Sequence, residues 1–429
     1  MSFKTISVIG LGYIGLPTAA MFASRKIKVI GVDVNQHAVD TINRGEIHIV
    51  EPELDMLVHA SVTEGYLKAV TSPEPADAFL IAVPTPFKSS LNKESESEIP
   101  EPDLTYIESA AKAIAPVLKK GDLVILESTS PVGATEQMAE WLAEARTDLS
   151  FPQHVGDDAD VNVAHCPERV LPGHVVRELV ENDRVIGGMT TKCSERAIEL
   201  YKTFVEGDCV TTNARTAEMA KLTENSCRDV QIAFANELSI ICDKLDIDVW
   251  ELISLANRHP RINILQPGPG VGGHCIAVDP WFIVSKTPNE AQIIHTARKV
   301  NDAKPQWVIN KVKIAIADFL QENPTKTASD IRISCFGLAF KPDIDDLRES
   351  PSLAIAQQIA KMHTSTVNYI EPNINELPSK VAENARLVNF EIAMTQTDIA
   401  VLLVDHKQFK QKEKLHPDMV VIDTKGIWG

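Results

Sequence analysis

Residues 5–15 read TISVIGLGYIG, and this stretch decides the fold of the first part of the chain. Its opening residues, Thr5–Ile9, are mostly apolar or β-branched and predict a buried strand. The glycines that follow predict a tight turn, and the apolar residues after Gly15 begin a helix. Residues Lys28–Asp33 predict a second strand. This order of elements indicates a mostly parallel sheet covered by helices.

The turn has the form Gly-x-Gly-x-x-Gly, at Gly10, Gly12 and Gly15. Such glycines permit the tight turn and let a pyrophosphate approach the backbone. Asp33 ends the next strand 18 residues after Gly15. A carboxylate there accepts hydrogen bonds from ribose hydroxyls and repels a 2′-phosphate. The pattern therefore predicts binding of NAD rather than NADP.

Length and charge limit the possible functions. A chain of 429 residues predicts two or three domains. Its 42 basic and 59 acidic residues give a net charge of −17, which repels phosphate backbones and anionic lipids. We therefore expect neither nucleic-acid nor membrane binding. The chain has no signal-peptide pattern at its start and no apolar run of about 18 residues, which predicts a cytoplasmic protein.

The sequence predicts an α/β fold with two Rossmann-like parallel-sheet domains joined by a central helical region. Strand patterns at 78–83 and 123–126 extend the first domain, expected over residues 1–205. The second, smaller sheet is expected in residues 306–429. Its predicted strands are 331–337, 367–370, 399–404 and 420–423.

Residues 206–305 form the expected helical region. Ala214–Leu245 contains neither proline nor glycine and repeats apolar residues at helical spacing, which predicts one long helix. Such a helix is either a buried core element or a dimer surface, and we expect a homodimer. The polar, proline-flanked segment Lys88–Pro102 predicts a mobile surface loop without chemistry.

Cys275 is the strongest catalytic candidate from sequence. The cluster Gln266–Gly273 is rich in glycine and proline, so we expect another group to approach its backbone closely. Cys275 follows directly, in a turn whose amides could stabilise a developing anion; the alternative is an inert thiol. The other six cysteines are scattered and form no CxxC pair, which predicts free thiols in a reducing compartment.

Other polar residues have two interpretations each. Lys221, Asn225 and Arg228 share one helix face, either as a solvated surface or as oxyanion and phosphate donors. Hydroxyls in 83–86 and 127–135 follow predicted strands, as cofactor contacts or as ordinary turns. Residues 336–351 offer Lys341 and Arg348 to an anion, or form a surface loop of mixed charge. His259 and His274 lack nearby ligand pairs, so we expect no metal.

Four motifs in order, GLGYIG, AEMAKLTEN, GPGVGGHCIAVDP and GLAFKPDIDDLRESP, closely resemble the UDP-glucose and GDP-mannose dehydrogenase family over essentially the whole chain. Residues 166–173 and 258–266 look like the branch that acts on UDP-N-acetyl-D-mannosamine. The resemblance implies NAD binding by residues 1–205, catalysis and dimerisation by 206–305, and UDP-sugar binding by 306–429.

The resemblance implies a four-electron oxidation at C6 of the sugar with two NAD⁺, for a bacterial surface polysaccharide such as the enterobacterial common antigen. Cys275 would form a thiohemiacetal whose oxidation gives a thioester, which water hydrolyses. Lys221 and Asn225 would stabilise oxyanions, and Asp279 and a water near Thr129 would handle protons. Glu168 is a further candidate for the hydrolysis step.

The resemblance also implies two sets of binding residues. The NAD contacts would be Gly10, Gly12, Tyr13, Ile14, Gly15, Asp33, Thr85 and Thr135. The UDP-sugar contacts would be Arg169, Val170, Lys221, Asn225, Arg228, His259, Arg261, Gly272, Phe340, Lys341 and Arg348.

Two departures from the family pattern bear on the substrate. UDP-glucose enzymes usually carry a lysine where this chain has Val278, and an acidic residue where it has Gly173. These changes argue against UDP-glucose. The alternatives are a UDP-N-acetylglucosamine 6-dehydrogenase, a two-electron hydroxy-acid dehydrogenase that needs no nucleophilic cysteine, and a non-catalytic sensor of NAD and a nucleotide sugar.

Overall fold

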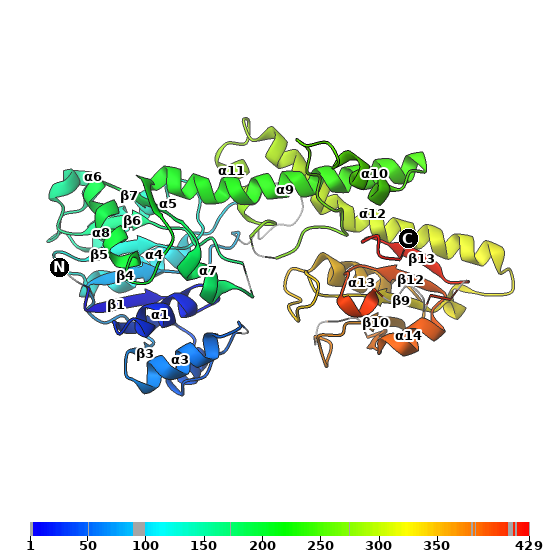
Figure 1. Cartoon of the computed structure of the whole chain (residues 1–429), viewed down its shortest axis with the longest axis horizontal. Coiled ribbons are helices and arrows are strands. Elements are labelled where there is room, and N and C mark those ends of the chain that lie inside the picture. Colours follow the sequence, from blue (N-terminus) through cyan, green and yellow to red (C-terminus); the bar gives the residue numbers. More distant parts are fainter. Residues whose placement is uncertain are drawn as a thin grey trace. The chain divides into compact units, whose positions relative to one another are not determined.

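The computed structural model describes residues 3–49, 51–88, 99–171, 173–273, 275–378, 381, 383–410, 415–416 and 418–428 (Figure 1). The chain divides into two compact units, Met1–Glu224 with Ser285–Thr287 and Asn225–Val284 with Pro288–Gly429. Each unit contains one largely parallel sheet, so the predicted α/β fold with two such sheets is confirmed. Most of the predicted mobile loop, residues 89–98, lies outside the described residues.

The sheet of the first unit has eight strands in the order β3-β2-β1-β4-β5-β6-β7-β8. Neighbouring strands are parallel except β6 and β7, which pair antiparallel. Their bounds are β1 Thr5–Ile9, β2 Lys28–Val32, β3 Leu67–Val70, β4 Ala78–Ile81, β5 Leu123–Leu126, β6 Asn162–His165, β7 Arg184–Gly188 and β8 Cys209–Asn213.

Helices cover both faces of this sheet. One face packs against α1 (Gly15–Ser24), α2 (Gln36–Asn43), α3 (Leu54–Thr63), α7 (Val175–Glu181) and α8 (Thr191–Tyr201). The other packs against α4 (Thr105–Ile114) and α5 (Ala134–Ala145), and a short helix α6 spans Pro152–Val155. Side chains of one strand alternate between the two cores: Leu80 belongs to one and Phe79 to the other.

The second unit has five parallel strands in the order β11-β10-β9-β12-β13. Their bounds are β9 Ile333–Phe336, β10 Val367–Ile370, β11 Ala385–Leu387, β12 Ile399–Leu402 and β13 Val420–Asp423. Helices α12 (Gln292–Glu322) and α13 (Pro351–Met362) pack on one face, and α14 (Phe390–Gln396) packs on the other. Helices α10 (Val249–Ala256) and α11 (Asp279–Lys286) lie in the helical segment before this sheet.

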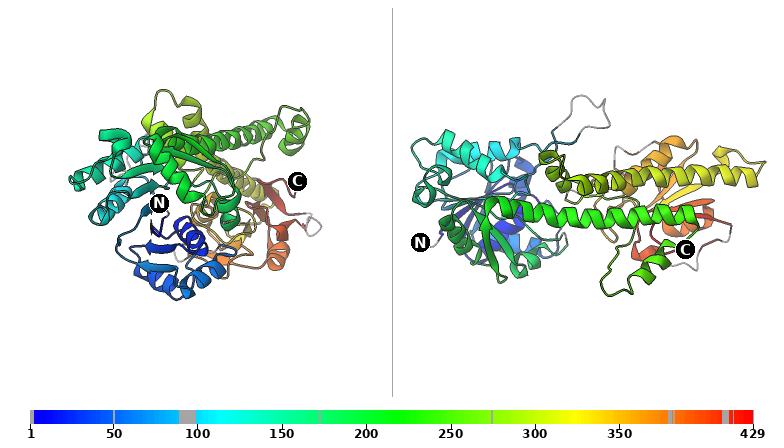
Figure 2. Two further views of the ribbon diagram at one scale, coloured as in Figure 1. Left: turned by 60° about the vertical axis from the view of Figure 1, so that its left-hand side comes forward. Right: turned by 90° about the horizontal axis from the view of Figure 1, so that it is seen from above.

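The predicted long helix is α9, which runs over Ala214–Leu245 as one element of 32 residues. In the second unit it lies beside α12 (Figure 2). Asn236 Nδ2 donates to Asn301 Oδ1 (2.8 Å), and the buried Arg298 forms an ion pair with Asp229 (2.6 Å). These polar contacts between two helices favour one register, because a shift of either helix would leave buried polar groups without partners. None of the described helices is long and apolar enough to cross a membrane.

Candidate active site

The glycine turn after β1 has the close packing that its sequence predicts. Gly10 has φ of +92° and donates its N–H to Val32 O (2.8 Å). A Cβ at Gly10 would lie 2.7 Å from Ala82 O, and one at Gly15 would lie 1.8 Å from Gly10 O. A side chain at either position would therefore displace the turn.

This turn has the features needed for a dinucleotide. No side chain of the described residues caps the N-terminus of α1, whose backbone N–H groups therefore suit an anion. Asp33 lies beside the turn, with Oδ2 accepting from Leu11 N–H (2.9 Å) and Oδ1 from Asn35 N–H (2.9 Å). An oxygen has two lone pairs, so Asp33 keeps acceptor capacity for ribose hydroxyls. The residues present thus fit NAD.

The three predicted threonines differ in their surroundings. Thr85 Oγ1 is buried and has no hydrogen-bond partner among the described residues. Thr129 is half-buried in the loop after β5. Thr135 is buried, and its hydroxyl donates to Glu218 Oε1 (2.6 Å). The hydroxyl of Thr135, a predicted NAD contact, therefore already donates its proton to a protein carboxylate.

Glu168 lies in a buried charged cluster after β6. It forms an ion pair with Arg184 (2.9 Å), and both side chains are buried. Glu127, also buried, accepts from the Tyr201 hydroxyl (2.6 Å). Burial raises the pKa of Glu127 to about 7, although the Arg184 guanidinium favours its charged form. Two carboxyl groups thus share one buried cation, and one of them can exchange a proton near neutral pH.

Arg169, next to Glu168, is held on the surface of the same unit. Its guanidinium makes an ion pair with Glu224 of α9 (2.7 Å) and donates to Asp183 O (3.2 Å). Val170 is half-buried against the core. The segment after β6 therefore presents a fixed, half-exposed cation, as a sugar or phosphate contact requires.

The structure brings three predicted catalytic residues together in the second unit. Cys275 is exposed, and its carbonyl accepts the N–H of Asp279 (2.8 Å), the first residue of α11. Asp279 is 3% exposed and accepts from Asn225 Nδ2 through its Oδ2 (2.5 Å). An exposed thiol thus lies one turn before a buried carboxylate that binds an amide of α9. Lys221 is one helical turn before Asn225 on the same helix.

The close approach expected at the glycine and proline cluster is confirmed. A Cβ at Gly272 would lie 2.6 Å from Glu349 O and 3.1 Å from Phe340 Cβ. The ring of Phe340 lies 3.5 Å from the Cβ position of Gly273, whose φ is +82°. The loop that carries Cys275 therefore packs directly on the loop between β9 and α13.

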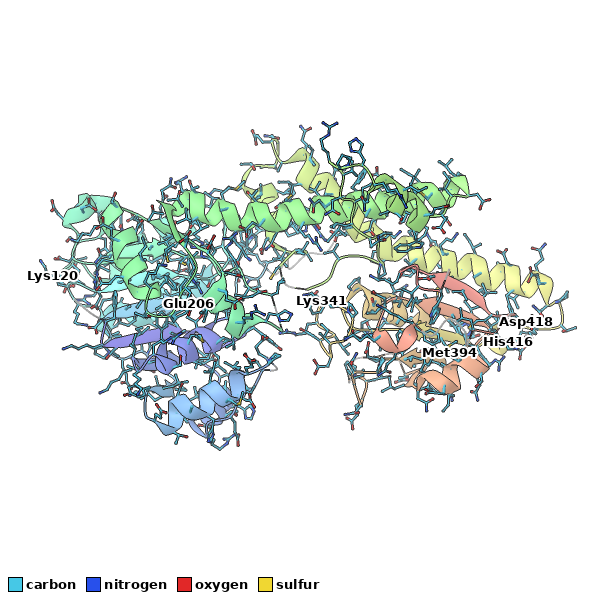
Figure 3. The ribbon with its side chains drawn as sticks, viewed as in Figure 1. Lys120, Glu206, Lys341, Met394, His416 and Asp418 are labelled. Atoms are coloured by element: carbon cyan, nitrogen blue, oxygen red, sulfur yellow. The ribbon has the colours of Figure 1, made fainter. Side chains whose placement is uncertain are left out.

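That second loop also carries Lys341 and Arg348. Figure 3 labels Lys341 after β9, at the opposite side of the unit from His416 and Asp418. Arg348 makes two hydrogen bonds to Asp346 (2.8 and 2.6 Å). Two cations thus lie on the loop against which the Cys275 segment packs, at the carboxyl ends of the strands, where this fold binds ligands.

The described contacts do not bring every predicted residue to the Cys275 segment or to the loop between β9 and α13. His259 and Arg261 lie on the exposed turn after α10, where Arg261 N–H donates to His259 Nδ1 (3.4 Å). Arg228 is exposed on α9. His274 lies outside the described residues. Within the described part of the chain, no group of three His, Cys, Asp or Glu side chains could hold a metal ion.

Sequence reasoning missed several buried polar residues beside these segments. Glu218 of α9 accepts from Gly133 N–H (2.7 Å), Thr135 N–H (2.8 Å) and the Thr135 hydroxyl. Its only signal was its position inside the AEMAKLTEN motif. Glu127 begins the segment 127–135, in which the sequence pattern points to the hydroxyl side chains and not to the carboxyl group. Nothing in the sequence pattern singled out Glu371 or His406, which are buried in the second unit.

Family models match three consecutive segments of the chain. They describe the NAD-binding domain (residues 4–205), the central domain (215–303) and the UDP-binding domain (334–429) of the UDP-glucose/GDP-mannose dehydrogenase family. The chain belongs to this family. It is therefore an NAD-dependent dehydrogenase with a UDP-binding domain, and the expected cofactor is confirmed.

Members of the family that resemble this chain include UDP-N-acetyl-D-mannosamine dehydrogenases. The one from Yersinia pestis is 67% identical and the one from Escherichia coli K12 is 65% identical, each match covering all of both chains. Among solved structures, the UDP-D-ManNAc dehydrogenase of Pyrococcus horikoshii has a TM-score of 0.83 at 36% identity, over 99% of this chain and 96% of that one. The UDP-N-acetyl-mannosamine dehydrogenase Cap5O of Staphylococcus aureus has a TM-score of 0.80 at 38% identity, over 99% and 95%.

Proposed function

We propose that this family member oxidises C6 of UDP-N-acetyl-D-mannosamine to the uronate, using two NAD⁺ per sugar, for a bacterial surface polysaccharide. The observation that carries the proposal is the hydrogen bond from Asn225 to Asp279 at 2.5 Å, one turn beyond the exposed Cys275. Cys275 would supply a nucleophile, Asn225 an oxyanion donor and Asp279 a buried carboxylate, the groups that a covalent oxidation of an aldehyde requires.

NAD, held by the glycine turn and Asp33, would supply the hydride acceptor for each oxidation. In the first oxidation C6 goes from alcohol to aldehyde. The Cys275 thiol then adds to the aldehyde carbon, and the thiol proton leaves through Asp279 or a water. Lys221 and Asn225 would donate hydrogen bonds to the oxygen on C6. An amide has two N–H groups, so Asn225 can bind Asp279 and this oxygen together.

Oxidation of the thiohemiacetal gives a thioester at Cys275. Attack by water releases the carboxylate and restores the thiol. Asp279 would accept a proton from this water. Thr129 and Glu168 keep the roles in hydrolysis that the resemblance implies, and the Glu168 cluster can store a proton, because burial raises the pKa of Glu127 to about 7. The two-electron alternative would use neither Cys275 nor this hydrolysis.

The choice of sugar is supported by the relatives. The two most similar enzymes named above act, by name, on UDP-N-acetyl-D-mannosamine, at 67% and 65% identity. A second sugar has comparable support: an NDP-N-acetyl-D-galactosaminuronic acid dehydrogenase of Ralstonia nicotianae is 63% identical over all of this chain. UDP-N-acetylglucosamine stays an alternative because it differs from the mannosamine sugar only at C2.

We further propose a cytoplasmic homodimer. Its interface would be the apolar groove between α9 and α12, lined by Val230, Ala233, Phe234, Glu237, Gln292, Ile293, Thr296, Ala297 and Val300. Ile293 is 72% exposed and Phe234 is 52% exposed, and exposed apolar side chains that lie together often mark a protein–protein contact. All seven cysteines are described and none forms a disulfide, which suits a reducing compartment.

The test is the amount of NADH formed per limiting sugar at completion. UDP-N-acetyl-D-mannosamine, UDP-N-acetylglucosamine, UDP-N-acetylgalactosamine and UDP-glucose are compared in parallel. Two NADH with the mannosamine sugar, at the highest kcat/KM of the panel, support the proposal. One NADH per sugar would eliminate the thioester route, and a higher kcat/KM for another sugar of the panel would change the substrate but keep the chemistry.

A further inference from the structure

The second unit repeats the turn that binds the cofactor in the first. Gly337 follows β9 with φ of +90° and donates its N–H to Ile370 O (2.8 Å). Gly10 follows β1 with φ of +92° and donates to Val32 O (2.8 Å). In each unit an acidic residue follows the second strand, Asp33 after β2 and Glu371 after β10.

Asp33 and Glu371 differ in burial and in hydrogen-bond partners. Asp33 binds two backbone N–H groups at the edge of its turn and is half-buried. Glu371 is buried, and its Oε2 accepts from Leu338 N–H (2.7 Å), Ala339 N–H (3.0 Å) and His406 Nε2 (3.0 Å). Its carboxylate therefore fills the turn itself and cannot receive a ribose.

His406 links this carboxylate to the loop that carries Lys341. Its Nδ1 lies 2.9 Å from the backbone N–H of Asp343 and 3.2 Å from Asn373 Nδ2, which are both donors. Nδ1 must therefore accept, so the ring proton is on Nε2 and is donated to Glu371. This assignment follows from the partners of the ring.

Asp343 lies at a turn in that loop. Its φ of +61° is unusual for a residue with a side chain and requires support from its surroundings. Its N–H binds His406, and its Oδ1 accepts from Lys407 N–H (3.0 Å). Lys341 lies two residues before Asp343, and Arg348 lies five residues after Asp343.

We propose that Glu371 and His406 are positioning residues, which hold the Phe340–Arg348 loop in the conformation that binds the nucleotide diphosphate of the substrate. The proposal deepens the proposed function and rests on it for the roles of Lys341 and Arg348. Asp33, the acid expected to bind the ribose in the first unit, thus corresponds to Glu371 in the second. There the acid would hold the Phe340–Arg348 loop instead of binding a ribose.

The test compares His406→Ala, His406→Gln and Glu371→Gln with the parent enzyme. Binding of UDP is measured by calorimetry without NAD, and kcat and KM are measured for the nucleotide sugar and for NAD. We expect the Kd of UDP and the KM of the sugar to rise about tenfold or more in His406→Ala, while kcat at saturating sugar and the KM of NAD stay unchanged. Gln offers one donor and one acceptor, so His406→Gln should recover most of the affinity.

The matched control is His363→Gln. His363 is buried in the same unit and contacts Ile331 O (2.9 Å), before the start of β9 and away from the Lys341 loop. It should lower the melting temperature without changing UDP binding. Unchanged UDP affinity in His406→Ala, or an equal loss in His363→Gln, would overturn the proposal. Failure of the parent enzyme to reduce NAD would refute the proposed function alone, because UDP binding is measured independently.

Discussion

At the residue scale, Cys275 differs from the buried cysteines in its exposure. Burial raises the pKa of Cys166 to about 12 and also raises the pKa of Cys335, so both thiols stay protonated near neutral pH. Cys275 is exposed and lies in a glycine turn, where an incoming carbonyl can reach it. Its motif and the close packing around it could be predicted from sequence, because glycine and proline determine the backbone conformation at their own positions.

Cys275→Ala should abolish complete turnover, because no thioester can form. We expect kcat for uronate formation to fall by about a thousandfold or more. The measurement is NADH per sugar together with product analysis. Cys227→Ala is the control: Cys227 is also exposed, on α9, and this change should leave kcat within about twofold. Two NADH per sugar at normal rate in Cys275→Ala would contradict the covalent mechanism.

Glu127 gives a pH prediction. Its pKa rises from 4.5 in the unfolded chain to about 7 in the fold, so the folded state binds more protons between these values. Stability should therefore fall as pH rises from about 4.5 to 7, by a few kcal/mol at most. Glu127→Gln keeps an acceptor for Tyr201 and removes the proton exchange. It should be more stable than the parent at pH 8 and similar at pH 5, by denaturant unfolding.

An exposed carboxyl provides the comparison. Glu144 lies on the surface of α5, and Glu144→Gln should leave the pH dependence unchanged. If Glu127→Gln has the pH slope of the parent, the proton is held elsewhere in the cluster.

At the element scale, Glu218 joins α9 to α5. Its carboxylate binds the N–H groups of Gly133 and Thr135 at the start of α5, where a helix favours a negative charge. The contact connects the helix of Lys221 with the loop that follows Thr129. Glu218 is 1% exposed, so its hydrogen bonds are strong and their loss leaves buried donors unpaired.

Glu218→Ala and Thr135→Val should each destabilise the protein by about 1–3 kcal/mol, and the double variant by less than the sum. A double-mutant cycle in chemical unfolding measures this coupling. The pair Arg215 and Glu136 is the control, because it joins the same two helices at the surface (2.6 Å). Its coupling should stay below about 1 kcal/mol. Equal coupling for both pairs would show that burial does not decide the energy.

Long-range contacts of this kind set the limit of prediction from sequence. The α9 helix and strands such as β5, β10 and β13 agree with their predicted bounds, because their patterns are local. The antiparallel neighbours β6 and β7 received no prediction, since short buried strands lack alternation and their pairing depends on the rest of the sheet. The contact of Asn225 with Asp279 joins residues far apart in sequence. It could not be predicted from local patterns and became visible only in the folded structure.

At the scale of the whole molecule, the proposed homodimer can be tested at the groove between α9 and α12. Phe234→Glu would place a charge in the proposed interface next to Glu237, so the dissociation constant of the proposed dimer should rise about tenfold or more. Sedimentation velocity over a concentration series measures this. Ile392→Glu is the control, because Ile392 is an exposed apolar side chain on α14 outside the groove. A Phe234→Glu protein that stays dimeric would place the interface elsewhere.

The continuity of α9 also constrains how this gene can change. Lys221 belongs to one compact unit and Asn225 to the other, yet both lie on one uninterrupted helix. Each residue of an α-helix turns the chain by about 100°. A single codon gained or lost between them would rotate one of these two donors away from its present direction, whatever amino acid it encoded. Selection should therefore tolerate substitutions on the outer face of this segment far more readily than insertions or deletions within it.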